Sequence, residues 1–299
     1  MNPQSTSRVW PLVGFLVGVL VLLAGVLVSY SVVGGGVDFP VMYVMGKGWL
    51  EGTNVYLPEQ TAAFRAQYGV DQYGMFYPPA TGFTMLPLAL LPYPVAKWTW
   101  FVIIELSLIL GIRALVRLAA PRARDHVWMI CAGIVLASSS LRWGLMLLQA
   151  APFVLALLCF MVVALHTDRP RLALAVAILA TAMKVTLGVP FLALLALHRR
   201  LRAVAVCLGS WAALNVLGFL RMGAGSLAEY RRNVAHLETI GHISSPDPWR
   251  PIALPRLDWV YLFYGVTGSL SVSRIASLAT SALVFGLLLR EGLRVRTPP

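Results

Sequence analysis

The first acidic residue of the chain, Asp38, stands where a hydrophobic segment ends. Residues 12–33 are almost entirely apolar, and Gly34, Gly35 and Gly36 separate them from the carboxylate. Glycine adopts backbone conformations that other residues avoid, so these glycines could turn the carboxylate back toward a membrane. A lone carboxylate in that place can act as a general base, or it can be a solvated group that follows a helix end.

A second candidate is Lys184, which lies near the middle of a 26-residue apolar run, residues 172–197. A charged side chain in such a run either faces a cavity, where it could bind phosphate, or extends to the membrane interface. Gly188 and Pro190 follow closely and favour an interruption of the helix. We therefore predict two half-helices that meet at Lys184 and place the basic turns at 166–171 and 198–202 on one side.

Other polar side chains could contact a sugar or a phosphate. Gln149 separates two apolar runs and could hydrogen-bond a substrate or bridge two helices. Tyr43 and Tyr77 could stack on sugar rings or anchor the chain at the interface. Four cationic or titratable side chains, which are also compatible with an ordinary polar loop, lie further along: Arg231, Arg232, His236 and His242.

The elements that must position these residues are membrane helices. The chain has 299 residues, of which 59% are hydrophobic and 12% charged, and its mean hydropathy is +0.77. Soluble domains are about 25% charged. Apolar runs of roughly 20 residues recur and match helices that cross a hydrocarbon core of about 30 Å. We expect an all-α polytopic membrane protein with roughly seven to nine membrane helices, and a single domain over residues 1–299.

The charge distribution suggests which loops lie on which side of the membrane. The formal net charge is +12, and the basic residues cluster in short loops between apolar runs, as cytoplasmic loops do. A nucleic-acid partner is therefore not expected. Two longer polar loops, at 34–78 and 221–258, fall on the outer side in this topology. Within the first loop, 39–50 and 60–68 are predicted to form short amphipathic helices at the interface.

Neither a disulfide framework nor a metal site is predicted. Cys131, Cys159 and Cys207 are far apart and lie inside apolar runs, where they fit as small core residues. No cluster of residues has the spacing of metal ligands.

Several short motifs, in their order and spacing, carry a family resemblance. They are DFPVMY at 38–43, GWLEGTNVY at 48–56, FYPP at 76–79, LPLALLP at 86–92, and Lys184 followed by an apolar run that ends in Arg199 and Arg200. This pattern resembles the polyprenol-phosphate-mannose-dependent mannosyltransferases of the GT-C glycosyltransferase superfamily. The family usually has Gly-Gln-x-Asn where this chain has Leu148, Gln149, Ala150 and Ala151, so only the glutamine is shared.

The resemblance implies a GT-C-type transmembrane bundle whose active site faces the outer side of a bacterial cytoplasmic membrane. It implies an inverting glycosyltransferase with Asp38 as general base. The donor would be a polyprenyl-phosphate sugar, with mannose as the sugar, and the acceptor a lipid-linked or cell-envelope glycan. No cofactor besides the donor is expected. The alternative is a transporter or lipid flippase, which would explain a broken helix around Lys184 but not the acids and aromatics gathered in residues 34–78.

Overall fold

The computed structural model describes residues 3–32, 38–68, 75–240, 259–269, 271–280 and 283. These residues are helical or irregular, and the described part of the chain contains no β-strand. The chain forms two compact units, Met1–Val234 and Ala235–Pro299. The expected all-helical class is confirmed for the described residues.

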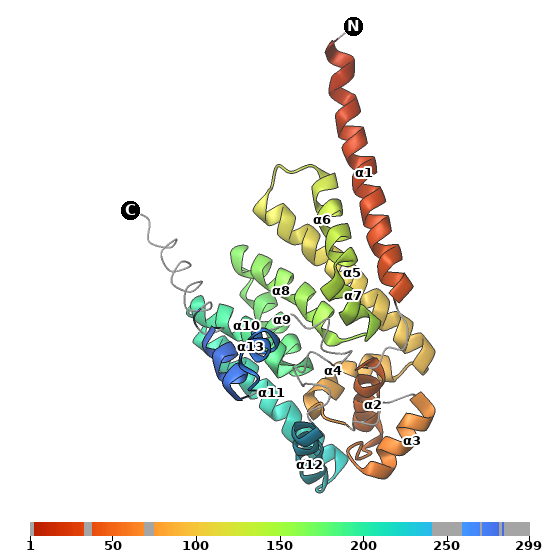
Figure 1. The fold of residues 1–299 in the computed structure, drawn as a ribbon, viewed down its shortest axis with the longest axis vertical. Helices are drawn as coiled ribbons and strands as arrows, with labels where there is room; N and C mark the ends of the chain where they lie inside the picture. Colours follow the sequence, from red (N-terminus) through yellow and green to blue (C-terminus); the bar gives the residue numbers. More distant parts are fainter. Residues whose placement is uncertain are drawn as a thin grey trace. The chain divides into compact units, whose positions relative to one another are not determined.

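The first unit contains α1 to α11 and the start of α12 (Figure 1). The bounds are α1 (Pro3–Val32), α2 (Asp38–Glu51), α3 (Pro58–Tyr68), α4 (Pro79–Ala89), α5 (Tyr93–Ala119), α6 (Asp125–Ala137), α7 (Ser139–Met146), α8 (Ala150–His166), α9 (Pro170–Met183), α10 (Val185–Leu197), α11 (Leu201–Met222) and α12 (Ser226–Ile240). The second unit contains the end of α12, α13 (Trp259–Thr267) and a helical stretch at 271–280.

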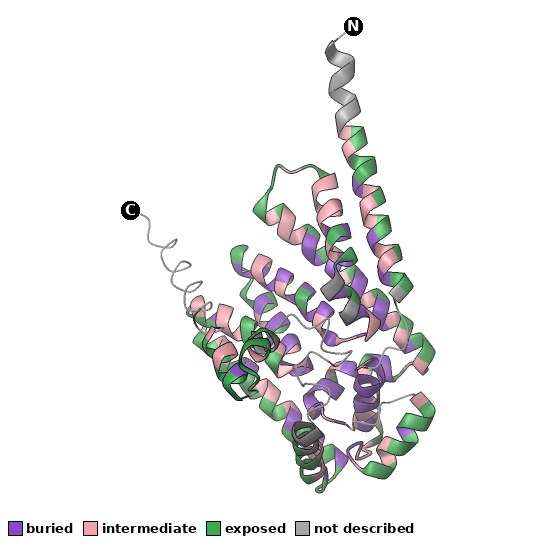
Figure 2. Cartoon of the chain, viewed as in Figure 1, coloured by how far each residue is buried: buried purple, intermediate pink, exposed green. Residues whose placement is uncertain are grey.

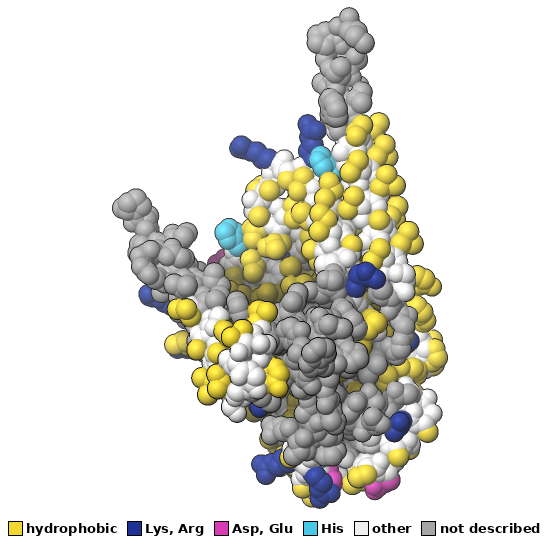
Figure 3. All heavy atoms as spheres, in the orientation of Figure 1, with side chains coloured by type: hydrophobic (Ala, Val, Ile, Leu, Met, Phe, Trp, Pro, Cys, Tyr) yellow, Lys and Arg dark blue, Asp and Glu magenta, His cyan; other side chains and the backbone are white. Residues whose placement is uncertain are grey.

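Two helices of the described chain are long and apolar enough to cross a membrane, namely Pro11–Ser31 of α1 and all of α11. Shorter apolar helices are α6, α8, α9 and α10. Only 17% of the apolar stretch of α1 is buried within the protein, and large apolar side chains such as Leu20 and Leu27 are exposed. Hydrophobic side chains cover the flank along α1, whereas charged side chains gather near the α5–α6 loop and over α3 and α12 (Figure 3).

Glycines let α1 pack closely on α6. A Cβ atom added to Gly133 would lie 2.3 Å from the carbonyl oxygen of Val21, and one added to Gly25 would lie 2.7 Å from that of Gly133. Such close backbone approach is typical of helix pairs in membranes. There the hydrophobic effect does not drive association, and small residues allow the tight packing that does.

The two helices of the first polar loop differ in burial (Figure 2). Both were predicted, but α2 is not amphipathic, because every residue from Phe39 to Gly46 is buried. Gly82 of α4 permits this, since a Cβ there would come within 2.5 Å of the Met45 carbonyl oxygen. The prediction of an interfacial amphipathic helix is therefore wrong for α2. In α3 only Phe64 is buried, as expected of an amphipathic helix.

The apolar run at 172–197 is broken at Lys184, as predicted. Lys184 has an extended backbone (φ −158°, ψ 107°) between α9 and α10. An ion pair of 3.1 Å between Asp168 Oδ1 and Arg200 Nη2 joins the turns at the far ends of the two half-helices, so both basic turns lie together. A second interruption, at Ser138, separates α6 from α7.

Candidate active site

Three of the residues singled out in the sequence, Gln149, Lys184 and Tyr77, come together around Asp38. Asp38 begins α2, and the side chains of Gln149 and Lys184 interact with its carboxylate and favour its charged form. Tyr77 also lies close enough to be influenced by the charge of Asp38. The Lys184 Nζ atom lies 5.7 Å from the centroid of the Tyr77 ring, a cation–π contact. The group therefore draws on four separate parts of the chain.

The surroundings of Asp38 favour proton acceptance. Burial raises the pKa of its carboxyl above the ordinary aspartate value, and the Lys184 charge and the Gln149 hydrogen bond oppose part of that rise. A carboxylate with a raised pKa is a stronger base than an exposed one, while its two partners stabilise the charged form. Burial, and to a smaller extent the charge of Asp38, raise the pKa of the Tyr77 phenol, so Tyr77 stays a protonated donor.

Lys184 is placed by the interruption between α9 and α10. The carbonyl of Met183 accepts a hydrogen bond of 2.9 Å from the hydroxyl of Thr81 in α4. Gly188 allows close contact with the preceding half-helix, because a Cβ there would lie 2.6 Å from the Thr181 hydroxyl oxygen. A backbone group freed by the break thus finds a partner on a neighbouring helix, as apolar surroundings require.

Gln149 is placed by a turn between α7 and α8. The carbonyl of Leu147 accepts a hydrogen bond of 3.0 Å from the backbone N–H of Asp38. Leu148 has a left-handed backbone with φ of 51°, which costs a non-glycine residue roughly 1–2 kcal/mol. Its side chain is fully buried, and packing of such a leucine contributes about 2–5 kcal/mol, which exceeds the strain. The left-handed conformation is a physical reason for the glycine that the resemblance leads one to expect at this position.

Tyr77 is placed by hydrogen bonds to the segment around it. Its carbonyl accepts a hydrogen bond of 2.9 Å from the hydroxyl of Tyr56. Three residues further along, the Ala80 N–H at the start of α4 donates to Asn215 Oδ1 at 3.0 Å. Asn215 was not singled out from the sequence, although a lone buried amide inside the apolar run of α11 is the kind of signal that could have identified it.

A family model decides the class of protein to which this site belongs. Residues 76–297, which are 222 of the 299 residues, match the model of Glycosyltransferase family 87 (GT87). The chain belongs to Glycosyltransferase family 87. GT87 is a polyprenol-phosphate-sugar-dependent membrane family of the GT-C superfamily, so this chain is a membrane glycosyltransferase. No curated protein and no solved structure matches the chain.

The GT87 match covers part of the site. Tyr77, Gln149 and Lys184 lie inside the matched residues, whereas Asp38 precedes them. The assignment of Asp38 as base therefore depends on its contacts and on the motif order around it.

Among the described residues, Tyr43, Arg231 and Arg232 are not brought to this group. The hydroxyl of Tyr43 donates to the Leu91 carbonyl at 2.8 Å, and its ring packs against Phe39, Tyr68 and Tyr93. Arg231 and Arg232 are exposed on α12, where Arg232 pairs with Glu229 at 2.9 Å. The side chain of His236, all of His242 and the glycines at 34–36 lie outside what the structure describes. Roles for these residues in GT87 chemistry stay predictions.

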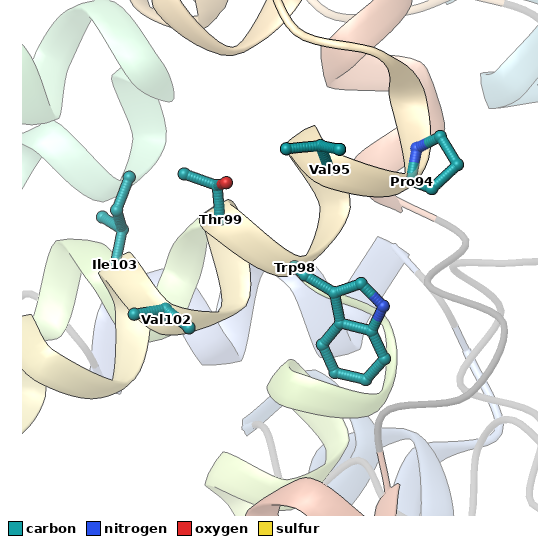
Figure 4. Close-up of a pocket in the computed structure, with 6 residues that line it drawn as sticks. All are labelled: Pro94, Val95, Trp98, Thr99, Val102 and Ile103. Carbon is teal, nitrogen blue, oxygen red and sulfur yellow. The ribbon is translucent and has the colours of Figure 1, made fainter.

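Two depressions accompany the described helices. One, of about 520 Å³, is lined by six residues of α5 and has Thr99 as its polar side chain (Figure 4). The other, of about 290 Å³, lies among α6, α7 and α8 and has Gln149 in its lining, so it adjoins the Asp38 group. Among the described residues, no three His, Cys, Asp or Glu side chains gather where they could hold a metal ion.

Proposed function

We propose that this chain transfers mannose, with inversion at the anomeric carbon, from a polyprenyl-phosphate donor to a lipid-linked or cell-envelope glycan acceptor. Asp38 is the general base. The observation that carries this proposal is a half-buried carboxylate that interacts with the Gln149 and Lys184 side chains, in a chain of family GT87.

The chemistry needs one well-placed carboxylate. Asp38 takes the proton of the acceptor hydroxyl as the acceptor oxygen attacks the anomeric carbon of the donor. The bond from that carbon to the phosphate oxygen breaks, and polyprenyl phosphate leaves with the electron pair. A retaining glycosidase, in contrast, needs a second carboxylate that forms a covalent intermediate. The raised pKa of Asp38 suits proton acceptance.

Lys184 is the group that stabilises the leaving phosphate. Negative charge grows on the phosphate oxygens as the sugar bond breaks, and an ammonium placed in advance lowers the energy of that state. The face of the Tyr77 ring holds the Lys184 Nζ atom at 5.7 Å and so limits the positions the ammonium can occupy. Lys184 also stabilises the ionised form of Asp38 before the reaction.

The site faces the outer side of a bacterial cytoplasmic membrane, within a single GT-C-type domain of seven to nine membrane helices over residues 1–299. Three observations support this placement. Asp38 follows the end of α1, a helix long enough to cross the membrane. Arg122 and Arg124 lie in the turn at the end of α5 remote from Tyr93. The Asp168–Arg200 pair joins the half-helix ends remote from Lys184. In this arrangement α3 lies at the interface.

The proposal is tested with purified protein, polyprenyl-phosphate mannose and a panel of glycolipid acceptors. Asp38→Asn keeps the size of the side chain and removes the base, and it should lower turnover about 10²- to 10⁴-fold. Glu51→Gln is the matched control, because it removes a carboxylate at the exposed end of the same helix. Full transfer by Asp38→Asn would exclude Asp38 as the base. Transfer from polyprenyl-phosphate glucose but not from the mannose donor would exclude mannose.

A further inference from the structure

We propose that Trp100 is a positioning residue for Asp38, acting through the backbone of the turn at residues 147–149. This inference rests on the proposed function only in that Asp38 is taken as the base. Trp100 itself lies in α5, more than sixty residues along the chain from Asp38, and it touches the turn that holds the carboxylate.

The Trp100 indole is held by a hydrogen bond and by packing. Its Nε1–H donates a hydrogen bond of 3.2 Å to the carbonyl oxygen of Leu148. Only 2% of the residue is exposed, and its ring centroid lies 5.2 Å from that of Phe153 in α8. A buried indole needs an acceptor for its N–H, so packing and hydrogen bonding select the same orientation.

The turn at 147–149 depends on hydrogen bonds from outside its own helices. Its inner bonds run from Leu148 N to Leu145 O at 3.0 Å and from Gln149 N to Gly144 O at 2.8 Å. Both bonds are donated by N–H groups of the turn to carbonyls of α7, so they leave the carbonyl of Leu148 without a donor. The carbonyl of Leu148 is directed away by its left-handed backbone, and the Trp100 indole satisfies it there. A buried carbonyl without a donor is unfavourable, so loss of the indole N–H should shift the turn toward another conformation.

Both the backbone and the side chain of Asp38 are attached to this turn. The Asp38 N–H donates to Leu147 O at 3.0 Å, and the Gln149 side chain interacts with the Asp38 carboxylate and lowers its pKa. The residues bound to Asp38 therefore flank the one that Trp100 holds. A shift of the turn must move the carboxylate, the Gln149 side chain, or both, and small displacements of a catalytic group lower turnover strongly.

Trp100→Phe separates this role from simple packing, because phenylalanine keeps an aromatic ring against Phe153 and removes the N–H. Trp98→Phe is the matched control on the same helix. The Trp98 ring stacks on Tyr30 with centroids 5.7 Å apart, and the residue is 43% exposed. The control makes the same chemical change without touching the turn.

Three measurements on the full-length protein test the inference: kcat and KM for transfer, the pH dependence of kcat/KM, and the midpoint of thermal unfolding. Trp100→Phe should lower kcat about tenfold with little change in KM. The acid limit of the pH profile should move to higher pH, because the Gln149 hydrogen bond that opposes the raised pKa of Asp38 is weakened. Lys184 and Tyr77, the other groups that face Asp38, are unchanged in this variant. Trp98→Phe should keep the wild-type profile.

A double variant sharpens the test. Gln149→Leu should move the acid limit in the same direction. Trp100→Phe should add little to that shift in the Gln149→Leu background, since both changes act on the acid limit through the Gln149 side chain. A wild-type kcat and acid limit in Trp100→Phe would overturn the inference, as would a purely additive double variant. If Trp100→Phe does not fold, Trp100→Met, which fills the space flexibly without an N–H, decides by the same criteria.

Failure of the proposed function is recognised separately. Full transfer by Asp38→Asn would refute the base assignment whatever Trp100→Phe does. Loss of transfer in Asp38→Asn together with an unaltered Trp100→Phe would refute the positioning role alone.

Discussion

The helix interruptions at Lys184 and at Leu148 both deliver a side chain to Asp38, but they do so in opposite ways. Lys184 has an extended backbone that any residue can adopt. The backbone therefore places no restriction on the residue type, and the side chain can be one with a chemical role. Leu148 has a left-handed backbone that suits glycine, yet it is a leucine that fills the core. One interruption supplies a functional side chain itself, and the other supplies a backbone turn whose neighbour, Gln149, is functional.

The two interruptions are similar in how their backbone is held. The Met183 carbonyl is bound by Thr81, and the Leu148 carbonyl is bound by Trp100. In both cases the donor comes from an earlier helix of the chain. Each turn therefore depends on a hydrogen-bond donor that only the tertiary fold supplies.

Among changes at the two interruptions, Lys184→Met should have the largest effect, because it removes the charge and keeps the apolar stem. Turnover should fall about 10²- to 10³-fold, as expected for loss of a group that stabilises the transition state. The acid limit of the pH profile should also move upward, since the Lys184 cation lowers the pKa of Asp38 and its removal lets that pKa rise.

The control for this prediction is Lys47→Met, which removes a lysine that lies over the Tyr43 ring, in α2. It should keep both turnover and pH profile. Wild-type turnover in Lys184→Met would show that the interruption at Lys184 does not itself supply a functional side chain.

Leu148→Gly compared with Leu145→Gly measures the strain at the second interruption. Both leucines are fully buried, but Leu145 is helical and Leu148 is left-handed. Glycine relieves strain at 148 and adds a helix penalty at 145, so Leu148→Gly should be the less destabilising by about 2 kcal/mol. Denaturant unfolding of the detergent-solubilised protein gives the two values. Equal losses would show that Leu148 carries no strain.

Asp168→Asn should have the smallest effect. Asp168 closes the turn between α8 and α9, and its side chain is 89% exposed in the pair with Arg200. Exposed ion pairs contribute less than about 1 kcal/mol, and asparagine tolerates the left-handed φ of 51° found here. The thermal midpoint should therefore fall by about 4 °C at most. A larger fall would mean that this turn, and not Lys184, controls the hairpin of α9 and α10.

The sequence predicted the features that leave a local signal. Lys184 with Gly188 and Pro190 in one apolar run predicted the break between α9 and α10, and the motif order predicted the family. The contrast between α2 and α3 could not be predicted, because burial of α2 on all sides depends on glycine contacts with α4. Composition alone cannot distinguish a buried short helix from one lying at an interface.

The supporting residues of the site were missed for a related reason. Trp100 and Asn215 lie in apolar helices where a tryptophan or an amide has many possible uses. Their hydrogen bonds reach 48 residues along the chain to Leu148 and 135 residues to Ala80, respectively. Tyr43 was singled out by its motif position, and the structure shows that its hydroxyl binds the Leu91 carbonyl. Its contact with a substrate stays a prediction.

The hairpin of α9 and α10 also bears on how the chain enters the membrane. With 14 and 13 residues, the two half-helices are about 20 Å long, less than the roughly 30 Å of a bilayer core. The tip would bring the Met183 carbonyl into lipid with no partner of its own. Thr81, which binds that carbonyl, is synthesised 102 residues earlier. Because synthesis proceeds from the N-terminus, the donor for this carbonyl has already been made when the tip of the hairpin is synthesised.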